Sequence, residues 1–279
     1  MRICNIRVNG EAHLGVVTAR GVADATAAGC RETIDGVIAG AERAALAEIE
    51  SNAALPVVDA PEYLNVVNTP GKLVCVGLNY RAHAEKVDLK SAEVPILFSK
   101  FADALAPSGA AVTLPAWEDS YDYEAELVIV MGKRAWNVTE EEAAECIFGY
   151  TCGNDLSCRA PQKRTSQWLI GKALPGFGPC GPCIVTADGF DPAAGKRIRS
   201  WVNGELRQDG STADMIHSCA RIVSYASRYI ALEPCDLIFT GTPSGVALEK
   251  HGEEQQWLRP GDVVDVEIEG IGRLTNKMV

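Results

Sequence analysis

The sequence lacks long apolar runs, and no stretch approaches the roughly 20 consecutive apolar residues that a membrane-spanning helix requires. Its opening residues, Met1-Arg2-Ile3-Cys4-Asn5, do not show the basic segment followed by an apolar segment that marks a secretory signal peptide. We therefore expect a chain without membrane association, located in the cytoplasm.

Clusters of lysine and arginine are also absent, and the formal net charge is −11. A chain of this charge, with no patch that reverses its sign locally, is not expected to bind nucleic acid. No G-x-G-x-x-G motif follows a predicted strand, which argues against a Rossmann fold. The loop Thr240–Gly245 lacks the lysine and the spacing of a P-loop, so its backbone amides suit a carboxylate better than a nucleotide. Small molecules are the expected partners.

Paired histidines are missing as well, and a single C-x-x-C motif stands alone, which argues against a structural zinc site. The ten cysteines of a chain this large, without a signal peptide, are expected to be reduced core thiols. Cys180-Gly181-Pro182-Cys183 has the spacing of a redox dithiol, but the strand predicted at Ile184–Asp188 follows it. Because redox dithiols work at helix N-termini, a redox role is disfavoured.

What is present is an ordinary globular composition, 47% hydrophobic and 23% charged, in a chain long enough for one large core with a small domain appended. Arg2–Val8 and Glu11–Val17 flank Asn9-Gly10 and are predicted to form a hairpin. Apolar residues recur at helical spacing over 32–50, and prolines then punctuate the chain as far as residue 70. We predict a small α+β N-terminal domain, residues 1–70, followed by a larger domain, residues 71–279.

The larger domain is predicted to be mainly β with some α. One helix is expected to begin at the N-cap Thr139, and another to span Met215–Leu232 with Asp214 as its cap. Asn203-Gly204 marks a second hairpin. The main predicted strands are Lys72–Gly77, Pro95–Lys100, Asp122–Val130, Phe148–Gly153, Asp236–Phe239, Val263–Glu269 and Ile271–Met278.

Acidic residues open the predicted strand Asp122–Val130. Since side chains alternate along a strand, Glu124 and Glu126 share one face, with Asp122 as an additional candidate. A solvated strand edge is the ordinary explanation for two such acids. The same face becomes apolar later in the strand, however, which favours carboxylates at the rim of a pocket. Asp155, after the next predicted strand, is a reasonable third oxygen ligand for a hard metal ion.

Groups suited to proton transfer follow the strand Lys72–Gly77. A single histidine is most often an ordinary hydrogen-bonded residue, but His83 lies close to Tyr80 and Glu85 directly after a buried strand. That position makes His83 a candidate catalytic base.

Polar and cationic groups suited to an anion follow Asp155. Arg159, Gln162 and Lys172 can neutralise or orient an anionic substrate, although each taken singly is more often a surface group.

Together these stretches resemble the fumarylacetoacetate hydrolase family, and in particular its acylpyruvase and 2-hydroxyhepta-2,4-diene-1,7-dioate isomerase-like branch. The resemblance extends from about Lys72 to the C-terminus. The motifs that carry it are Val76-Gly77-Leu78-Asn79-Tyr80 with His83, Asp122-Tyr123-Glu124-Ala125-Glu126-Leu127, Gly153-Asn154-Asp155-Leu156-Ser157 with Arg159, Gly171-Lys172, Val202-Asn203-Gly204-Glu205, Thr240-Gly241-Thr242-Pro243 and Pro260-Gly261-Asp262.

The resemblance implies a mixed β-roll catalytic domain, preceded here by the small N-terminal domain, and a homodimer. It implies Mg²⁺ or Mn²⁺, with Ca²⁺ as a further candidate, held by Glu124, Glu126 and Asp155. The implied substrates are 2-oxo acids and 1,3-dicarbonyl compounds. Their chemistry proceeds through a metal-stabilised enolate. The leading expectation is hydrolysis of a carbon–carbon bond in an acylpyruvate-like compound. Decarboxylation of an oxaloacetate-like acid, isomerisation, and hydration or dehydration are the alternatives.

The resemblance also implies roles for individual residues. His83 acts as the base with Glu85 as its carboxylate partner, and Lys172 stabilises developing negative charge. The implied substrate-binding residues are Tyr80, Arg159, Gln162 and Thr242.

Two positions depart from the family pattern. The assisting glutamate usually lies three residues after the histidine, where this chain has Lys86, and Glu85 is one residue earlier. A histidine without its carboxylate partner favours decarboxylation, isomerisation or dehydration over hydrolysis. The usual Ala-Arg-Asp is Cys158-Arg159-Ala160 here, which removes one acidic contact around the metal ligands. A metal-binding relic that serves as a scaffold or ligand sensor is the non-enzyme alternative.

Overall fold

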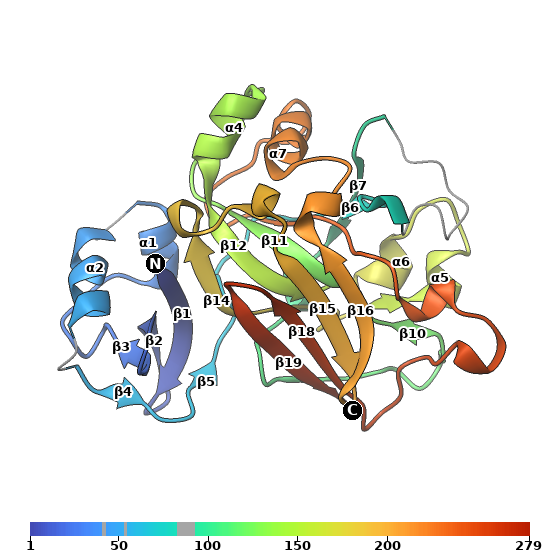
Figure 1. The fold of residues 1–279 in the computed structure, drawn as a ribbon, viewed down its shortest axis with the longest axis horizontal. Helices are drawn as coiled ribbons and strands as arrows, with labels where there is room; N and C mark the ends of the chain where they lie inside the picture. Colours follow the sequence, from blue (N-terminus) through green and yellow to red (C-terminus); the bar gives the residue numbers. More distant parts are fainter. Residues whose placement is uncertain (41–42, 53–54, 83–92) are drawn as a thin grey trace.

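The computed structural model of the chain describes residues 1–40, 43–52, 55–82 and 93–279. Strands form most of its regular structure, and short helices lie around them (Figure 1). The predicted mainly β fold with some α is confirmed. Within these described ranges, no helix is both long and apolar enough to cross a membrane.

A large mixed sheet of 12 strands organises the molecule. Its order is β4-β3-β2-β1-β14-β12-β11-β17-β6-β7, with β5 beside β1 and β8 beside β14. The central strands β11 and β12 are buried along their whole length. The strands are β1 (Arg2–Val8), β2 (Glu11–Thr18), β3 (Gly21–Asp24), β4 (Val57–Val58), β5 (Glu62–Tyr63), β6 (Leu73–Gly77), β7 (Ile96–Lys100), β8 (Leu105–Ala106), β11 (Ala125–Met131), β12 (Ile147–Asn154), β14 (Gly178–Thr186) and β17 (Leu237–Phe239).

A second sheet of five strands has the order β16-β15-β18-β19-β9. The predicted hairpin at Asn203-Gly204 is confirmed, and both residues have positive φ, 53° and 81°. Buried and partly exposed residues alternate along β15 and β18, so one face of this sheet lies on the core. The strands are β9 (Ala111–Val112), β15 (Arg197–Val202), β16 (Glu205–Ser211), β18 (Val263–Ile268) and β19 (Gly272–Met278).

The core lies on both faces of the large sheet. On one face, Leu127 and Ile129 of β11 belong to the same apolar cluster as Ile198 and Val266 of the five-stranded sheet. On the other face, Val128 of β11 belongs to a cluster with residues of the N-terminal strands and helices. Since alternate residues of β11 lie on opposite buried faces of the sheet, the strand is apolar from Leu127 to Met131, after the acidic Glu126 near its start.

The N-terminal hairpin is confirmed, with β1 and β2 joined through Asn9-Gly10. Strand β1 also pairs with β14, where Ile3 lies opposite Ile184, so the N-terminal strands continue the large sheet. The domain boundary at residue 70 stays a prediction.

The prediction of one continuous helix over 32–50 is wrong. The structure has two helices, α1 (Ile34–Ile38) and α2 (Arg43–Ser51). Gly40 adopts a φ of 113°, a left-handed conformation that ends the first helix.

The helix predicted after Thr139 is confirmed as α4 (Glu140–Cys146). The Thr139 hydroxyl accepts a hydrogen bond from the Glu142 amide, and the Glu142 carboxylate accepts one from the Thr139 amide.

The helix predicted at Met215–Leu232 is shorter, α7 (Cys219–Ser227). Its N-cap is Ser218, and not Asp214, which ends a 3₁₀ turn. Two further helices of four residues, α5 (Arg159–Gln162) and α6 (Leu169–Lys172), lie near the acidic residues described below.

All ten cysteines are free and buried, which confirms the prediction of reduced core thiols. Cys180 and Cys183 lie inside β14, and the motif therefore does not open a helix. Burial raises the pKa of both thiols, which is the opposite of the shift that activates a redox cysteine.

The single acidic strand predicted at Asp122–Val130 is interrupted. Strand β10 (Tyr121–Asp122) pairs with β13 (Ser157–Cys158), and β11 begins only at Ala125. Glu124 lies in the interruption, where its amide donates a hydrogen bond to Asn154 Oδ1 at 3.0 Å. Strand alternation is therefore not what brings Glu124 to Glu126, and that part of the prediction was wrong.

Candidate active site and metal centre

Three buried acids meet at one end of β11 and β12. Glu124, Glu126 and Asp155 each contribute a carboxylate oxygen, and these oxygens lie within 4.8 Å of one another. Their exposed fractions are only 6%, 1% and 0%. In the described part of the chain, this is the one group of three or more candidate ligands that meets such a distance.

Proximity of these carboxylates affects Glu126 most visibly. Its pKa lies well above the ordinary value, first because burial disfavours the charged form, and then because Asp155 and Glu124 repel it. The amide of Gly241 donates a hydrogen bond to Glu126 Oε2 at 2.8 Å, which opposes the shift without overcoming it. Ionising all three acids therefore requires additional positive charge.

Lys172 supplies part of that charge. Its ammonium donates hydrogen bonds to Glu124 Oε2 at 2.8 Å and to Asp155 Oδ2 at 2.7 Å. Burial alone would lower the pKa of Lys172, but Asp155 and Glu124 outweigh burial and hold the pKa above its ordinary value. The ammonium also lies 5.2 Å from the centre of the Phe98 ring. Lys172 thus carries a positive charge within the acidic cluster at neutral pH.

Arg159 forms a second ion pair with Glu124. Its Nη2 atom lies 2.6 Å from Glu124 Oε1 and 2.8 Å from Asp122 Oδ2, and its Nη1 donates to Gln162 Oε1 at 3.0 Å. Burial lowers the pKa of Arg159, but the charges of Asp122 and Glu124 raise it further than burial lowers it. The structure thus places Arg159 beside the acidic cluster with Gln162 as its neighbour, and their predicted substrate contacts stay a prediction.

Asp122 has a different environment from the three clustered acids. Its carboxylate accepts hydrogen bonds from Arg159 Nε and from the backbone amides of Tyr123, Ala247 and Leu248. These bonds occupy its oxygens, so Asp122 orients Arg159 and is not a ligand candidate. It also supplies Arg159 with a carboxylate partner, although the family's aspartate is replaced by Ala160 in this chain.

A second buried lysine, Lys100, was not identified from the sequence. Its Nζ lies 2.7 Å from Asp155 Oδ1, and its side chain is fully buried. It follows three partly exposed residues and one exposed residue of β7, and nothing in that local pattern distinguishes it from a surface lysine.

The donor set fits a hard divalent cation, because Mg²⁺ and Mn²⁺ prefer anionic oxygen ligands. Asp155 Oδ1 supports this fit: it is buried, and it accepts no hydrogen bond from any described residue. The Lys100 ammonium, 2.7 Å away, balances the charge of this oxygen, which remains available to coordinate a cation.

Tyr80 and Thr242, both predicted to bind substrate, are buried near these acids. The Tyr80 hydroxyl has no hydrogen-bond partner within the described ranges. Burial, and then the charge of Glu126, raise the pKa of Tyr80. The Thr242 hydroxyl instead donates to the Ala125 carbonyl at 2.9 Å and accepts from Gln208 Nε2 at 2.8 Å, so it supports β11.

Gln208 was also missed by the sequence analysis. Besides contacting Thr242, its side-chain oxygen accepts from the Ala125 amide at 2.9 Å. A buried glutamine on a hairpin strand carries no local signal of such a role.

The predicted base His83, its neighbour Glu85 and the divergent Lys86 lie outside the described residues. Their roles stay predictions.

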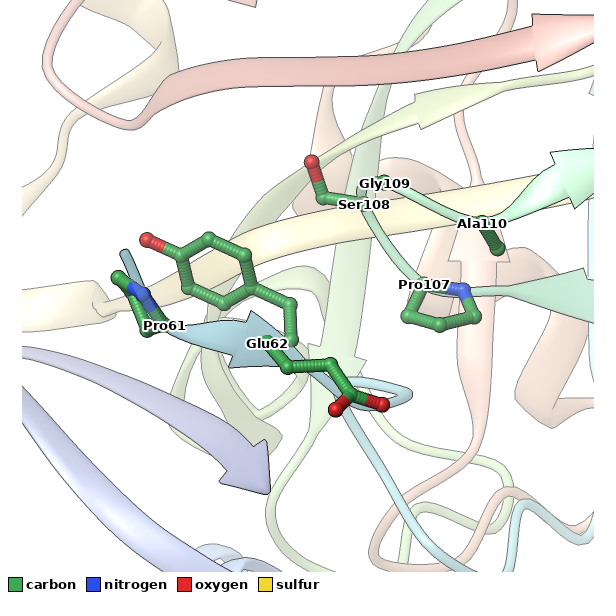
Figure 2. Close-up of a pocket in the computed structure, with 7 residues that line it drawn as sticks. Pro61, Glu62, Pro107, Ser108, Gly109 and Ala110 are labelled. Atoms are coloured by element: carbon green, nitrogen blue, oxygen red, sulfur yellow. The ribbon is translucent and has the colours of Figure 1, made fainter. Parts of the chain in front are cut away.

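A separate cavity of about 400 Å³ lies between β5 and the loop that follows β8 (Figure 2). It shares no residue with the acidic cluster. Its lining residues are Pro61, Glu62, Tyr63, Pro107, Ser108, Gly109 and Ala110.

Comparison with known proteins identifies one family. The family model described as "Fumarylacetoacetate (FAA) hydrolase C-terminal" matches residues 72–279. A curated relative, "Oxaloacetate tautomerase fahd2, mitochondrial" from Xenopus laevis, is 35% identical over 215 residues, covering 76% of this chain and 67% of the relative.

Solved structures agree over the whole chain. The fumarylacetoacetate hydrolase from psychrophilic Exiguobacterium antarcticum is 35% identical, with a TM-score of 0.88, covering 100% of this chain and 99% of that one. The maleylpyruvate hydrolase from Sphingobium sp. SYK-6, solved in complex with manganese(II) and pyruvate, is 28% identical, with a TM-score of 0.82 and the same coverage.

Proposed function

Because the chain belongs to the fumarylacetoacetate hydrolase family, we propose that it is a divalent-metal-dependent enzyme acting on a 2-oxo acid. The observation that carries this proposal is the buried group of Glu124, Glu126 and Asp155, in which Asp155 Oδ1 accepts no hydrogen bond from the described residues. Mn²⁺ or Mg²⁺ is the proposed ion, supported by the manganese in the related maleylpyruvate hydrolase.

The charge of the cluster supports an anionic substrate. Four buried carboxylates lie beside three buried cations. The carboxylates are the three clustered acids and Asp122, and the cations are Lys100, Arg159 and Lys172. With every group ionised the excess is one negative charge, and a divalent ion reverses it to one positive charge. A carboxylate group of the substrate then restores neutrality in a site that excludes most water.

A divalent ion supplies electrostatic stabilisation where negative charge develops on an oxo group. The chain's own contribution is to position charge around that point. Lys172 holds a proton firmly, since its pKa is raised, and so acts as a fixed cation and not as a base. Arg159 and Lys172 both contact Glu124 and restrict its carboxylate to one orientation.

Tautomerisation is the reaction that we favour. It moves one proton between the carbon next to the oxo group and the oxo oxygen, and breaks no carbon–carbon bond. The sequence relationship to an oxaloacetate tautomerase supports it, and so does Lys86 in place of the glutamate that assists hydrolysis. His83 is the proposed group that carries the proton.

Hydrolysis of a carbon–carbon bond in an acylpyruvate-like compound is the second candidate. The structural relationship to maleylpyruvate hydrolase favours it. In this reaction water must be activated for attack on the distal carbonyl, and Glu85 would have to serve as the partner of His83.

One experiment tests the class and separates the two reactions. Protein stripped with a chelator is assayed with and without added Mn²⁺ or Mg²⁺, on enol-oxaloacetate and on an acylpyruvate, and the products are identified by NMR. We expect metal-dependent ketonisation of oxaloacetate with no cleavage. Cleavage of the acylpyruvate into pyruvate and a second acid selects hydrolysis. Failure of both reactions with either metal would overturn the proposed function.

The homodimer and the cytoplasmic location also stay predictions. Light scattering coupled to size exclusion tests the first, with a mass near twice the 29.8 kDa of one chain expected.

A further inference from the structure

Lys100 ends strand β7 with a fully buried side chain. Its ammonium donates hydrogen bonds to three backbone carbonyls, those of Leu156 at 3.1 Å, Phe177 at 2.8 Å, and Lys172. Two of these carbonyls belong to segments that carry site residues. Leu156 directly follows Asp155, and Lys172 itself contacts both Asp155 and Glu124.

The donors of Lys100 are fully used by these carbonyls, because an ammonium group has three N–H bonds. Asp155 Oδ1 nevertheless lies 2.7 Å from Nζ, outside hydrogen-bond geometry, and keeps no hydrogen-bond partner among the described residues. The lysine therefore places positive charge beside this oxygen without occupying the lone pairs that a cation needs.

From this geometry we propose that Lys100 is a positioning residue for the metal site. It fixes the backbones that carry Asp155 and Lys172, and it keeps Asp155 Oδ1 aimed into the cluster and available as a ligand. Lys100 acts through these two residues and has no proposed contact with the substrate. The inference rests on the metal site of the proposed function and deepens it.

Removing Lys100 should change the metal affinity in opposite directions, depending on whether the lysine positions a ligand or acts only through its charge. A lysine that acted only by its charge would repel a cation, so removing it would tighten metal binding. A lysine that orients a ligand does the opposite, and the loss of such an orienting group typically weakens metal binding by about 10–100-fold.

The test measures Mn²⁺ binding to chelator-treated, full-length protein by calorimetry and by the EPR spectrum of bound Mn²⁺. In Lys100→Met we expect a dissociation constant at least about tenfold higher and a broadened spectrum. Lys100→Gln restores amide donors to the carbonyls without the charge, and should fold more readily while still binding Mn²⁺ more weakly than wild type.

Lys72→Met is the matched control. Lys72 Nζ also contacts a fully buried aspartate, Asp236, at 2.9 Å, but neither residue contacts the acidic cluster. Its Mn²⁺ affinity should equal that of wild type whatever its loss of thermal stability.

Each remaining outcome decides the inference. Wild-type or tighter Mn²⁺ binding in Lys100→Met overturns it, and so does failure of both Lys100 variants to fold while Lys72→Met folds, which would make Lys100 a structural anchor only. If wild-type protein itself does not bind Mn²⁺, the proposed function fails first, and this result is distinguishable from the others.

Discussion

The backbone amide of Asp155 donates a hydrogen bond to the carbonyl oxygen of Glu124 at 2.9 Å. Glu124 precedes β11 and Asp155 follows β12, and because these strands are antiparallel, the two residues meet at one end of the sheet. Their carboxylates repel each other, so the acids do not hold themselves together. The backbone hydrogen bonds between β11 and β12, together with the one between Asp155 and Glu124, bring the two carboxylates as close as a shared cation requires.

Replacing Lys172 with methionine should reduce kcat by about 100–1,000-fold, the usual loss when one charged group that stabilises the transition state is removed. The buried ammonium contacts both Glu124 and Asp155, and methionine retains its length without the charge. Steady-state kinetics with saturating Mn²⁺ measure the effect. Lys163→Met, at an exposed lysine, is the control and should leave kcat unchanged. Wild-type kcat in Lys172→Met would contradict the role of this residue.

Metal binding should strengthen as the pH rises, because the pKa of Glu126 is raised well above its ordinary value. Below that pKa, Glu126 carries a proton that a cation must displace. The dissociation constant for Mn²⁺ is therefore expected to fall about tenfold per pH unit until the pH passes the pKa of Glu126, and then to level off. Calorimetric titrations across pH measure this slope. Glu126→Gln should bind Mn²⁺ weakly and with a much flatter dependence, and an equally steep slope in that variant would assign the proton to another group.

The same raised pKa predicts the stability of the metal-free protein. In the unfolded chain Glu126 ionises near its ordinary pKa, and in the folded protein only at higher pH. The stability contributed by its protonated form is present below the unfolded pKa and is lost as the pH rises through the folded pKa. Glu126→Gln stays neutral, so metal-free protein with this change should unfold at higher temperature than wild type at alkaline pH. The difference should disappear at acid pH. A variant less stable than wild type at every pH would refute this explanation.

Local sequence signals predict those elements whose causes are local. Asn9-Gly10 and Asn203-Gly204 adopt the positive φ values that their hairpins require, and Thr139 caps its helix through a residue three positions away. The helix at 32–50 shows the limit of such signals. Its apolar periodicity continues past Gly40, whose left-handed conformation nevertheless ends the first helix.

The residues of the site also divide into those that the sequence indicates and those that depend on distant contacts. Glu126 and Asp155 could be identified because each lies at the end of an apolar strand, and the family motifs pointed to the same residues. Glu124 was identified for a reason that the structure does not support, since it lies outside β11. Lys100 and Gln208 depend on contacts with residues far away in the sequence, which no local pattern records.

Removing the carboxylate of Asp122 should lower the free energy of unfolding by about 3–5 kcal/mol, the cost typical of removing one member of a buried ion pair. Asp122→Ala leaves the guanidinium of Arg159 buried beside Glu124 alone, and three backbone amides lose their acceptor. Urea denaturation measures the loss. Asp209→Ala breaks the exposed pair with Arg197 and serves as the control, for which no resolvable change is expected. Equal effects of the two substitutions would contradict the buried role of Asp122.

Gly153 lies opposite Glu126 in the pairing of β11 with β12, and its lack of a side chain permits close packing beneath the acids. A Cβ atom there would lie 2.4 Å from Val128 Cγ2 and 2.9 Å from Phe239 Cε1. Gly153→Ala should therefore reduce the free energy of unfolding by about 1–3 kcal/mol through overpacking, and weaken Mn²⁺ binding by displacing β11.

Val128→Ala removes the methyl group that the new Cβ would meet, and this substitution alone should destabilise the core by leaving a cavity. Because each change relieves the defect created by the other, the double variant should be more stable than the sum of the two single losses predicts. Urea denaturation of all four proteins gives this coupling energy, and the Mn²⁺ affinity of the double variant should recover towards that of wild type. Strictly additive losses would show that the contact with Val128 is not the cause of the loss in Gly153→Ala, and does not control the position of Glu126.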